Sequence, residues 1–345
     1  MIEIYSTDTD SGTLTVFEDL DGTVRKVTSI RVGNAPRGSV RFTSDGLGYV
    51  SNTSANTVSE IDGLTHEEVR RIEVGNGPRG LYIVGNEQYL LVSNSGSDSL
   101  SIVDLALGKE VRQIPTGRDP RHMVVFNNHA YVSLWGEGSI AKFDVAGLER
   151  GDVDSVQLKA TIMLAPDTFP YSINVDETRK IALVACNAIQ SIPVIDLATD
   201  QVVRHVPLRA SGIRAITFSS DHRYALATLE RDNSAAVIDL DSFEVVRYLD
   251  AGPAPRGIVT NPEDGTFYVA AFSRTKTGLY DMPDWGSHGV TIIKAEGIDL
   301  SDAGSEVPTA SVPSGYGPCS VSVFDPEAAH AARAIKQPAL SERLA

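Results

Sequence analysis

The chain has 345 residues, of which 42% are hydrophobic and 22% are charged, and its formal net charge is −15. This composition is that of a globular protein with enough apolar residues for a large core. The acidic balance argues against a general nucleic-acid or anionic-membrane surface, because both attract basic faces. We therefore expect neither a nucleic-acid partner nor a membrane partner.

The N-terminus gives no sign of a targeting segment. Residues 1–7 contain neither the basic nor the apolar stretch of a signal peptide, and no segment approaches the roughly 18 apolar residues of a membrane span. The sequence as written predicts a cytoplasmic protein. Its two cysteines, Cys186 and Cys319, are too few for a disulfide framework and lack metal-ligand spacing.

A turn that contains Gly and Pro and ends in arginine recurs along the chain at a fixed period. The steps from Arg37 to Arg79, from Arg79 to Arg121 and from Arg214 to Arg256 are each 42 residues. A period in this range is typical of an array built from one supersecondary unit. The repeat therefore decides the fold prediction.

Each unit predicts four short strands joined as a meander, because its apolar stretches are brief and are separated by Gly, Asn and Asp. The stretches of the first two units are residues 39–42, 48–52, 57–62, 69–73, 81–84, 89–94, 100–104 and 111–114. An aspartate closes the third stretch in five units, where we expect it to cap the following turn. These residues are Asp62, Asp104, Asp144, Asp196 and Asp239.

Counting first strands gives seven units. They are expected to start near residues 38, 80, 122, 172, 215, 257 and 319. No strand is predicted after residues 320–324, whereas the N-terminus begins with three, at 3–6, 13–17 and 24–27. The simplest account completes the seventh unit from both termini, which removes an exposed sheet edge.

The sequence thus predicts an all-β fold, a seven-bladed β-propeller of four-stranded blades, whose ring closes where the N-terminal strands join the C-terminal first strand. We expect one domain over residues 1–325, with blade 7 shared by residues 1–31 and 314–325. The tail, residues 326–345, is Ala-rich after a proline and predicts a short helix that packs on the ring or on a partner subunit.

Three segments resemble a known family. The turn Val-Gly-x-x-Pro-Arg-Gly, the segment Tyr49-Val50-Ser51-Asn52 and the segment Ser101-Ile102-Val103-Asp104-Leu105 are similar to the YVTN-repeat seven-bladed β-propellers, in the lactonase-like and quinoprotein-like superfamily. The resemblance covers about residues 1–325 and implies the fold. Function stays open, because this fold carries binding proteins, lactonases, lyases and cyclases.

The first strand of each propeller blade lines the central channel, so the residue after the turn proline should form a ring at one mouth. In blade order this ring reads Arg37, Arg79, Arg121, Tyr171, Arg214, Arg256 and Cys319. Five guanidinium groups cannot relieve their repulsion by titrating, so negative charge is expected nearby. It could come from a bound carboxylate or phosphate, or from carbonyls and aspartates of adjacent blades.

The two breaks in the ring, Tyr171 and Cys319, divide the arginines into arcs of three and two. An elongated dianion could span such a mouth.

Blade 6 also departs from the repeat, because residues 273–288 replace its short loop between the second and third strands. A loop this long suggests a lid or pocket wall, with Tyr280 and Trp285 as ligand contacts; packing or a subunit interface is the alternative.

Candidates for proton transfer are few. His122 follows Arg121 where blades 1, 2 and 6 place Gly, and it either points into the site or is an ordinary core histidine. Glu230 lies in the mouth loop of blade 5 and is a base or an ion-pair partner of Arg231. His288 closes the blade 6 insertion and is a third candidate.

Asn187 is expected either to offer its amide to a ligand or to form a turn. Cys319 would need a neighbouring base to become a nucleophile, and no histidine is expected beside it. The chain has no His-x-His or Cys-x-x-Cys signature, and a cation would be poorly placed among five arginines. We therefore expect neither a metal nor a cofactor.

Two functions remain. The first is an enzyme of the hydrolase, lyase or cyclase type, in which arginines bind an anionic metabolite and stabilise a developing oxyanion while His122, His288 or Glu230 transfers the proton. The second is a non-catalytic propeller that binds a small anion, a peptide or a protein. Either could be a monomer or a homodimer.

Overall fold

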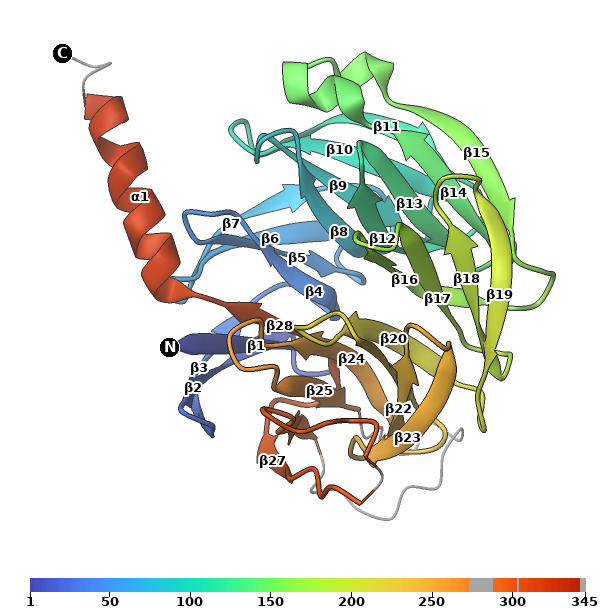
Figure 1. Ribbon diagram of the computed structural model, residues 1–345. Coiled ribbons are helices and arrows are strands. Elements are labelled where there is room, and N and C mark those ends of the chain that lie inside the picture. Colours follow the sequence, from blue (N-terminus) through green and yellow to red (C-terminus); the bar gives the residue numbers. More distant parts are fainter. Residues whose placement is uncertain (273–287, 303, 342–345) are drawn as a thin grey trace.

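The computed structural model describes residues 1–272, 288–302 and 304–341, the last five of these by their backbone only. Its strands form seven four-stranded antiparallel sheets around a central axis, as Figure 1 shows. The fold is a seven-bladed β-propeller, which confirms the predicted fold class. No described helix is long and apolar enough to span a membrane.

Blades 1 to 3 follow one another in the chain. Their strands are β4 (Pro36–Phe42), β5 (Leu47–Asn52), β6 (Thr57–Asp62), β7 (Glu67–Glu73), β8 (Pro78–Val84), β9 (Tyr89–Asn94), β10 (Ser99–Asp104), β11 (Lys109–Pro115), β12 (Pro120–Phe126), β13 (His129–Leu134), β14 (Ser139–Asp144) and β15 (Gln157–Met163). Two short 3-10 helices, η1 (Ala146–Arg150) and η2 (Val153–Ser155), precede β15.

Blades 4 to 6 continue the same order. Their strands are β16 (Pro170–Asp176), β17 (Ile181–Cys186), β18 (Ser191–Asp196), β19 (Gln201–Pro207), β20 (Ile213–Phe218), β21 (Tyr224–Leu229), β22 (Ser234–Asp239), β23 (Glu244–Asp250), β24 (Pro255–Thr260), β25 (Phe267–Ala271), β26 (Gly289–Ile293) and β27 (Thr309–Pro313). The first strands therefore begin close to the predicted positions.

Blade 7 is built from both ends of the chain. Its strands are β28 (Pro318–Phe324), β1 (Ile2–Asp8), β2 (Thr13–Leu20) and β3 (Thr23–Arg31), in that order from the axis outward. The closure is an antiparallel pairing of β1 with β28, in which Ile4 faces Val323 and Ser6 faces Val321. The predicted ring closure is confirmed.

The first strand of every blade lies nearest the axis, and the fourth forms the rim (Figure 1). Second and third strands are buried on both faces because each blade packs between two others; β9 has no exposed residue. Rim strands such as β11 expose alternate residues, as expected where one face of the strand is exposed to solvent. This arrangement places the chemistry-bearing positions on the inner strands.

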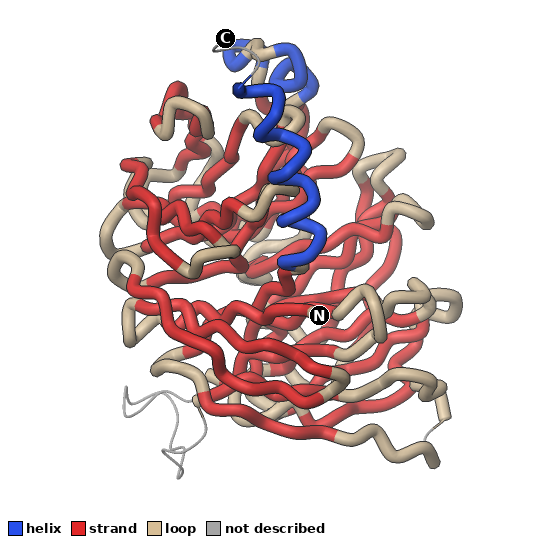
Figure 2. The backbone as a smooth tube through the Cα atoms, turned by 90° about the vertical axis from the view of Figure 1, so that its left-hand side faces the viewer, coloured by secondary structure: helices blue, strands red, loops and turns tan. Residues whose placement is uncertain are grey.

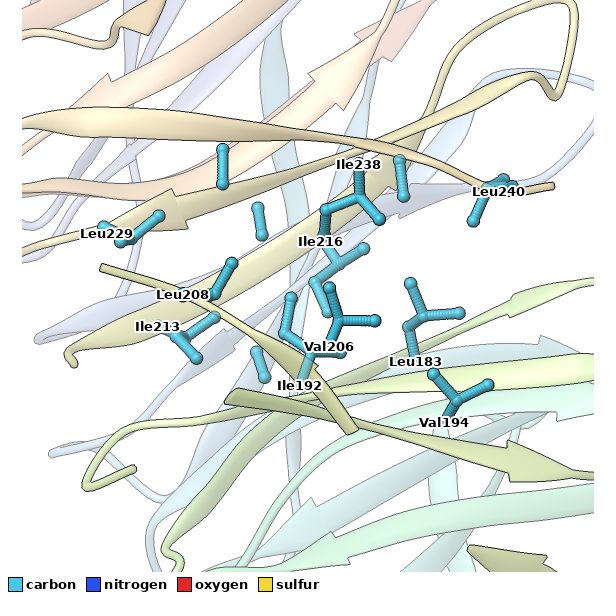
Figure 3. Close-up of a cluster of buried hydrophobic side chains, with 14 of the residues drawn as sticks. Leu183, Ile192, Val194, Val206, Leu208, Ile213, Ile216, Leu229, Ile238 and Leu240 are labelled. Atoms are coloured by element: carbon cyan, nitrogen blue, oxygen red, sulfur yellow. The ribbon is translucent and has the colours of Figure 1, made fainter. Parts of the chain in front are cut away.

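The core is distributed between blades rather than concentrated in one place. Figure 3 shows the cluster between blades 4 and 5, where Leu183 and Ile192 of blade 4 meet Ile216 and Ile238 of blade 5. Similar clusters lie between the other blades. Each blade is therefore fixed by its two neighbours, which holds the inner strands at set angles around the channel.

Hydroxyl groups in the second strands tie each blade to the next one at the axis. The Oγ of Ser51 lies 2.7 Å from the carbonyl oxygens of both Arg37 and Arg79. The hydroxyl of Thr228 likewise donates to the carbonyl of Arg256, over 2.6 Å. The backbone of the ring positions is thus held by buried hydrogen bonds, so their side chains start from fixed points.

Helix α1 (Pro326–Ser341) follows blade 7 and begins against blade 1, and Figure 2 shows it lying along the outside of the ring. Arg333 donates to both carboxylate oxygens of Asp62, over 2.7 and 3.1 Å, and to the carbonyl of Asp45. Ala329 is buried against Gly46. Of the two expectations for the tail, packing on the ring describes this part of the helix.

Asp8, the last residue of β1, is fully buried and accepts hydrogen bonds from the hydroxyls of Ser6, Thr13 and Thr15. The equivalent residues of blades 1 and 2 are asparagines, Asn52 and Asn94, whose amides make the same kind of contact with the third strand. Blade 7 thus carries a carboxyl group where the repeat elsewhere carries an amide. Burial raises the pKa of Asp8 from 3.8 to about 6, although its hydrogen bonds oppose the change.

A folded pKa above the unfolded value means that this group contributes stability below pH 4 that is lost as the pH rises through about 6. Asp8→Asn is therefore expected to raise the free energy of unfolding by about 3 kcal/mol at pH 7 and by little at pH 4. Urea unfolding at both pH values measures this, with Asp10→Asn, an exposed neighbour, as the control. Equal effects of Asp8→Asn at the two pH values would contradict the assignment.

Candidate functional site: the arginine mouth

One mouth of the channel is built from two concentric sets of residues. The inner ring is the second residue of each first strand, in the predicted order, because the first strands contact one another in the order β4, β8, β12, β16, β20, β24, β28. The outer ring is the residue after each second strand. It consists of Thr9, Thr53, Ser95, Trp135, Asn187, Glu230 and Phe272.

The same backbone hydrogen bond holds the outer ring in all seven blades. The N–H of each outer-ring residue donates to the carbonyl of the residue that precedes the first strand, over 2.9 to 3.2 Å. Ser95 donates to Gly77 in this way, and Glu230 donates to Gly212. Each outer-ring side chain is therefore placed beside the inner-ring residue of its own blade, and the differences between blades lie in the side chains.

Glu230 is the shared counterion of two arginines of the inner ring. Its Oε1 accepts hydrogen bonds from Nε and Nη2 of Arg256, over 2.9 and 2.6 Å, and its Oε2 accepts from Arg214. Glu230 is 3% exposed and Arg256 is 7% exposed. Burial would raise the pKa of Glu230, but the charges of Arg256 and Arg214 outweigh it and the pKa is lowered.

This arrangement corrects two sequence-based expectations. Glu230 pairs with Arg214 and Arg256 instead of Arg231, whose side chain bonds Ser211. The two guanidinium groups favour the ionised form of Glu230, so this carboxylate accepts a proton less readily than a free one. Its place is that of a fixed counterion.

A third arginine is neutralised within its own turn. Nε and Nη2 of Arg121 donate to the two carboxylate oxygens of Asp119, over 2.8 and 2.6 Å. The guanidinium group also lies over the ring of Trp135, with its carbon 4.4 Å from the ring centroid. Arg121 is thus fixed by a bidentate ion pair and an aromatic face together.

Aromatic faces orient the inner ring elsewhere too. Tyr171 lies between two arginines, with the guanidinium carbons of Arg214 and Arg121 at 4.7 and 5.7 Å from its ring centroid. The guanidinium group of Arg256 stacks on Phe272 at 3.6 Å. Three of the five arginines are therefore held by both a carboxylate and an aromatic ring.

Arg37 and Arg79 differ from the other three, because no carboxylate among the described residues pairs with either. Nε of Arg79 donates to Ser95 Oγ over 2.8 Å, and Nε of Arg37 is shielded from solvent without a hydrogen-bond partner. Burial and the charges of Arg121 and Arg37 lower the pKa of Arg79 to about 10, so it stays charged at neutral pH. Two adjacent blades thus present guanidinium groups that no carboxylate of the described residues pairs with.

A cavity lies in the channel beside these groups. Its volume is about 470 Å³, and its lining includes His122, Tyr171, Arg214, Arg256 and Cys319. A smaller hollow of about 30 Å³ lies among Arg37, Arg79, Arg121, His122 and Tyr171. His122 and Tyr171 border both spaces, so the hollow of the mouth lies next to the cavity in the channel.

His122 lines the channel, as one of the two sequence interpretations predicts. Its Nδ1 is buried without a hydrogen-bond partner. Burial, joined by the charge of Arg41, lowers the pKa of His122 to about 4, and a hydrogen bond to the backbone of Ile173 opposes this only in part. The imidazole is therefore neutral at pH 7 and can accept a proton.

Cys319 is a buried free thiol that borders the channel between Arg256 and Arg37. Burial works against its ionisation, yet the charges of Arg37, Arg256 and Arg79 lower its pKa overall. The inner-ring residue of blade 7 thus places a thiol at the cavity. The surrounding guanidinium groups favour the thiolate form of this group.

Two other candidates, His288 and Asn187, do not line the cavity. His288 is buried, and its Nδ1 accepts a hydrogen bond from the N–H of Gly317 over 3.3 Å, which ties it to the turn before β28. Asn187 belongs to the outer ring, and its Nδ2 is buried without a partner. Tyr280 and Trp285 lie outside the described residues.

Sequence reasoning missed three residues that shape the mouth, namely Asp119, Trp135 and Phe272. Asp119 stands two residues before Arg121, where the turns of blades 1 and 2 carry Ala35 and Gly77. Trp135 and Phe272 directly follow second strands. Aligning that position across the blades would have identified them. In the described part of the chain, no three His, Cys, Asp or Glu residues are placed to hold a metal ion.

Comparison with solved structures shows the fold and no closer relationship. The chain matches a provisionally assigned 6-phosphogluconolactonase from Bacteroides uniformis at a TM-score of 0.75 and 14% identity, covering 94% of this chain and 99% of that one. It matches a Kuenenia stuttgartiensis hydrazine synthase chain at a TM-score of 0.69 and 19% identity, covering 89% of this chain and 99% of that one. No protein-family model and no curated protein matches. The expected likeness to lactonase-like propellers thus holds for the fold.

Proposed function

We propose that the protein is a cytosolic enzyme of the YVTN-repeat propeller type that acts on a small anionic metabolite bound at the arginine mouth. The observation that carries the proposal is the pair Arg37 and Arg79, two guanidinium groups that pair with no carboxylate of the described residues, in a ring whose other arginines have such a partner. A carboxylate or phosphate placed between them would complete the pattern, with charge-assisted hydrogen bonds to planar donors.

The reaction would be a proton transfer supported by oxyanion stabilisation. His122 is neutral, has an unpartnered Nδ1 and borders both the mouth and the channel, so it is the proposed proton acceptor. The guanidinium groups would stabilise negative charge that develops on the substrate. The structural likeness to a provisionally assigned lactonase is consistent with a hydrolase, lyase or cyclase.

A second candidate function is non-catalytic binding of a small anion. The described lining of the cavity holds one imidazole and one carboxylate, that of Glu177, which is exposed. So sparse a set of proton-transfer groups favours a binding protein. The two functions share the arginines and differ in what His122 does.

A thermal-shift screen with carboxylated and phosphorylated metabolites, lactones included, tests the shared part. A ligand at 100 times its dissociation constant is expected to add about 2.7 kcal/mol of stability. The bound compounds are then followed by NMR for turnover. A screen in which no anion stabilises the protein would refute both functions.

His122→Asn separates the two functions. If His122 is the base, this change lowers kcat by about 100-fold or more while ligand affinity stays close to that of the wild type. The wild-type kcat/KM is expected to be flat between pH 6 and 8 and to fall towards pH 4, where His122 becomes charged. Turnover that survives in His122→Asn would rule out this residue as the base.

A further inference from the structure

A second uncompensated cation lies inside the channel. Arg41 stands four residues beyond Arg37 on β4, and its Nε donates to the carbonyl of Leu81 over 3.1 Å. Its guanidinium carbon lies 5.2 Å from the ring centroid of Tyr82. No carboxylate in the described chain forms an ion pair with it, and burial lowers its pKa. Arg41 therefore presents a positive charge that pairs with no acidic side chain of the described residues.

Arg41, Tyr82 and His122 form one wall of the channel, since they come from the adjacent blades 1, 2 and 3 and all border the 470 Å³ cavity. Arg41 is close enough to His122 to lower the pKa of its imidazole. Glu177 also borders the cavity, but it is exposed and makes no ion pair with Arg41. The interior thus has a cation of its own, separate from the mouth.

We propose that Arg41 binds a second anionic group of the same ligand, so that the channel takes a linear dianion along its axis. This inference rests on the anion-binding mouth proposed above, where Arg37 and Arg79 hold the first group. Four strand residues span at most about 13 Å, and the irregular pairing of β4 shortens this distance. A cavity of 470 Å³ is within the range of small-molecule sites.

The middle of such a ligand would pass His122. Its Nδ1 has no partner among the described residues, so a polar group of the ligand would find a hydrogen-bond partner there, and a hydroxyl suits it because a hydroxyl can both donate and accept. The inferred ligand is therefore a chain with an anionic group at each end and a hydroxyl between them. This describes a narrower class than the single anion that the mouth alone would select.

Isothermal titration of α,ω-dicarboxylates from succinate to sebacate, each against its own monomethyl ester at fixed ionic strength, tests the inference. One chain length is expected to bind about 10- to 150-fold more tightly than its monoester, because it gains one charge-assisted contact. In Arg41→Met the ratio of dicarboxylate affinity to monoester affinity falls to about one, while the monoester affinity itself is unchanged. In Arg37→Met both affinities fall.

Two further variants guard against a folding artefact. Arg41→Lys keeps the charge and is expected to retain most of the dianion preference, whereas Arg118→Met removes an exposed arginine of the mouth face and should change nothing. Thermal unfolding of each variant shows whether it is folded. A dianion that binds no better than its monoester at any length, or a preference that survives in Arg41→Met, overturns the inference. Absence of binding by every compound overturns the proposed mouth as well.

Discussion

Replacing Arg37 and Arg79 together by methionine is expected to weaken the binding of carboxylate and phosphate ligands by at least 100-fold. Each guanidinium group contributes a charge-assisted contact worth about 1.5–3 kcal/mol, and two such contacts correspond to a factor of 100 or more. Unlike the other three inner-ring arginines, neither has a carboxylate partner among the described residues. Isothermal titration with the best ligand of the thermal-shift screen measures the loss.

The same double variant is expected to be at least as stable as the wild type, since it removes two like charges that repel each other. This result would separate a binding role from a structural one, because loss of a structural arginine would lower both the ligand affinity and the free energy of unfolding. Arg118→Met, which removes an exposed arginine from the turn before β12, is the matched control. Wild-type affinity in the double variant, or an equal loss in the control, would exclude Arg37 and Arg79 as the anion site.

Glu230→Gln is expected to lower the free energy of unfolding by about 3–5 kcal/mol at pH 7. The change leaves the guanidinium groups of Arg214 and Arg256 buried without their shared counterion, and breaking a buried ion pair from one side costs about this much. Glu137→Gln, in the corresponding loop of blade 3, is the control, because Glu137 accepts a backbone N–H and pairs with no described cation. Urea unfolding gives both values.

The pH dependence of Glu230→Gln has a definite sign. The folded pKa of Glu230 is below its ordinary value, so its contribution to stability is present above the unfolded pKa and is lost as the pH falls through the folded pKa. The difference between wild type and Glu230→Gln should therefore shrink in acid. A variant that keeps its stability but loses turnover would show that Glu230 is the base after all.

The repeat alone was sufficient to predict the architecture. The 42-residue steps place seven first strands, and the three surplus N-terminal strands predict the pairing of β1 with β28 that closes the ring. The inner-ring residues follow from the same count. Periodicity reports which residues are equivalent, and equivalent residues of a propeller lie at equal depth in the channel.

The partners of the arginines could not be predicted in this way, because they depend on side-chain contacts between blades. The sequence placed Glu230 at the mouth and offered its neighbour Arg231 as an ion-pair partner. It did not predict that Glu230 contacts Arg256 of the next blade. Asn187 was expected to offer its amide to a ligand or to form a turn; β17 ends just before it, at Cys186, whereas β5 and β9 end on Asn52 and Asn94. A shift of one residue moves a side chain from the strand to the outer ring.

Arg41 and His122 show a second limit. Arg41 lies within a strand and stands outside every motif, and only the packing of three blades brings it near His122. A cation without a counterion is recognisable only when all its neighbours are known. The charge balance of the channel, on which the proposed function depends, is therefore a property of the folded ring.

Anomalous diffraction from a crystal of the wild-type protein soaked in selenate would test the anion site most directly. The account predicts a selenium peak between the guanidinium groups of Arg37 and Arg79, and none beside Arg121, Arg214 or Arg256, because each of these three already pairs with a carboxylate. The peak should vanish in the Arg37→Met, Arg79→Met double variant. A mouth without selenium, or a peak seated on Arg214 and Arg256, would contradict the account.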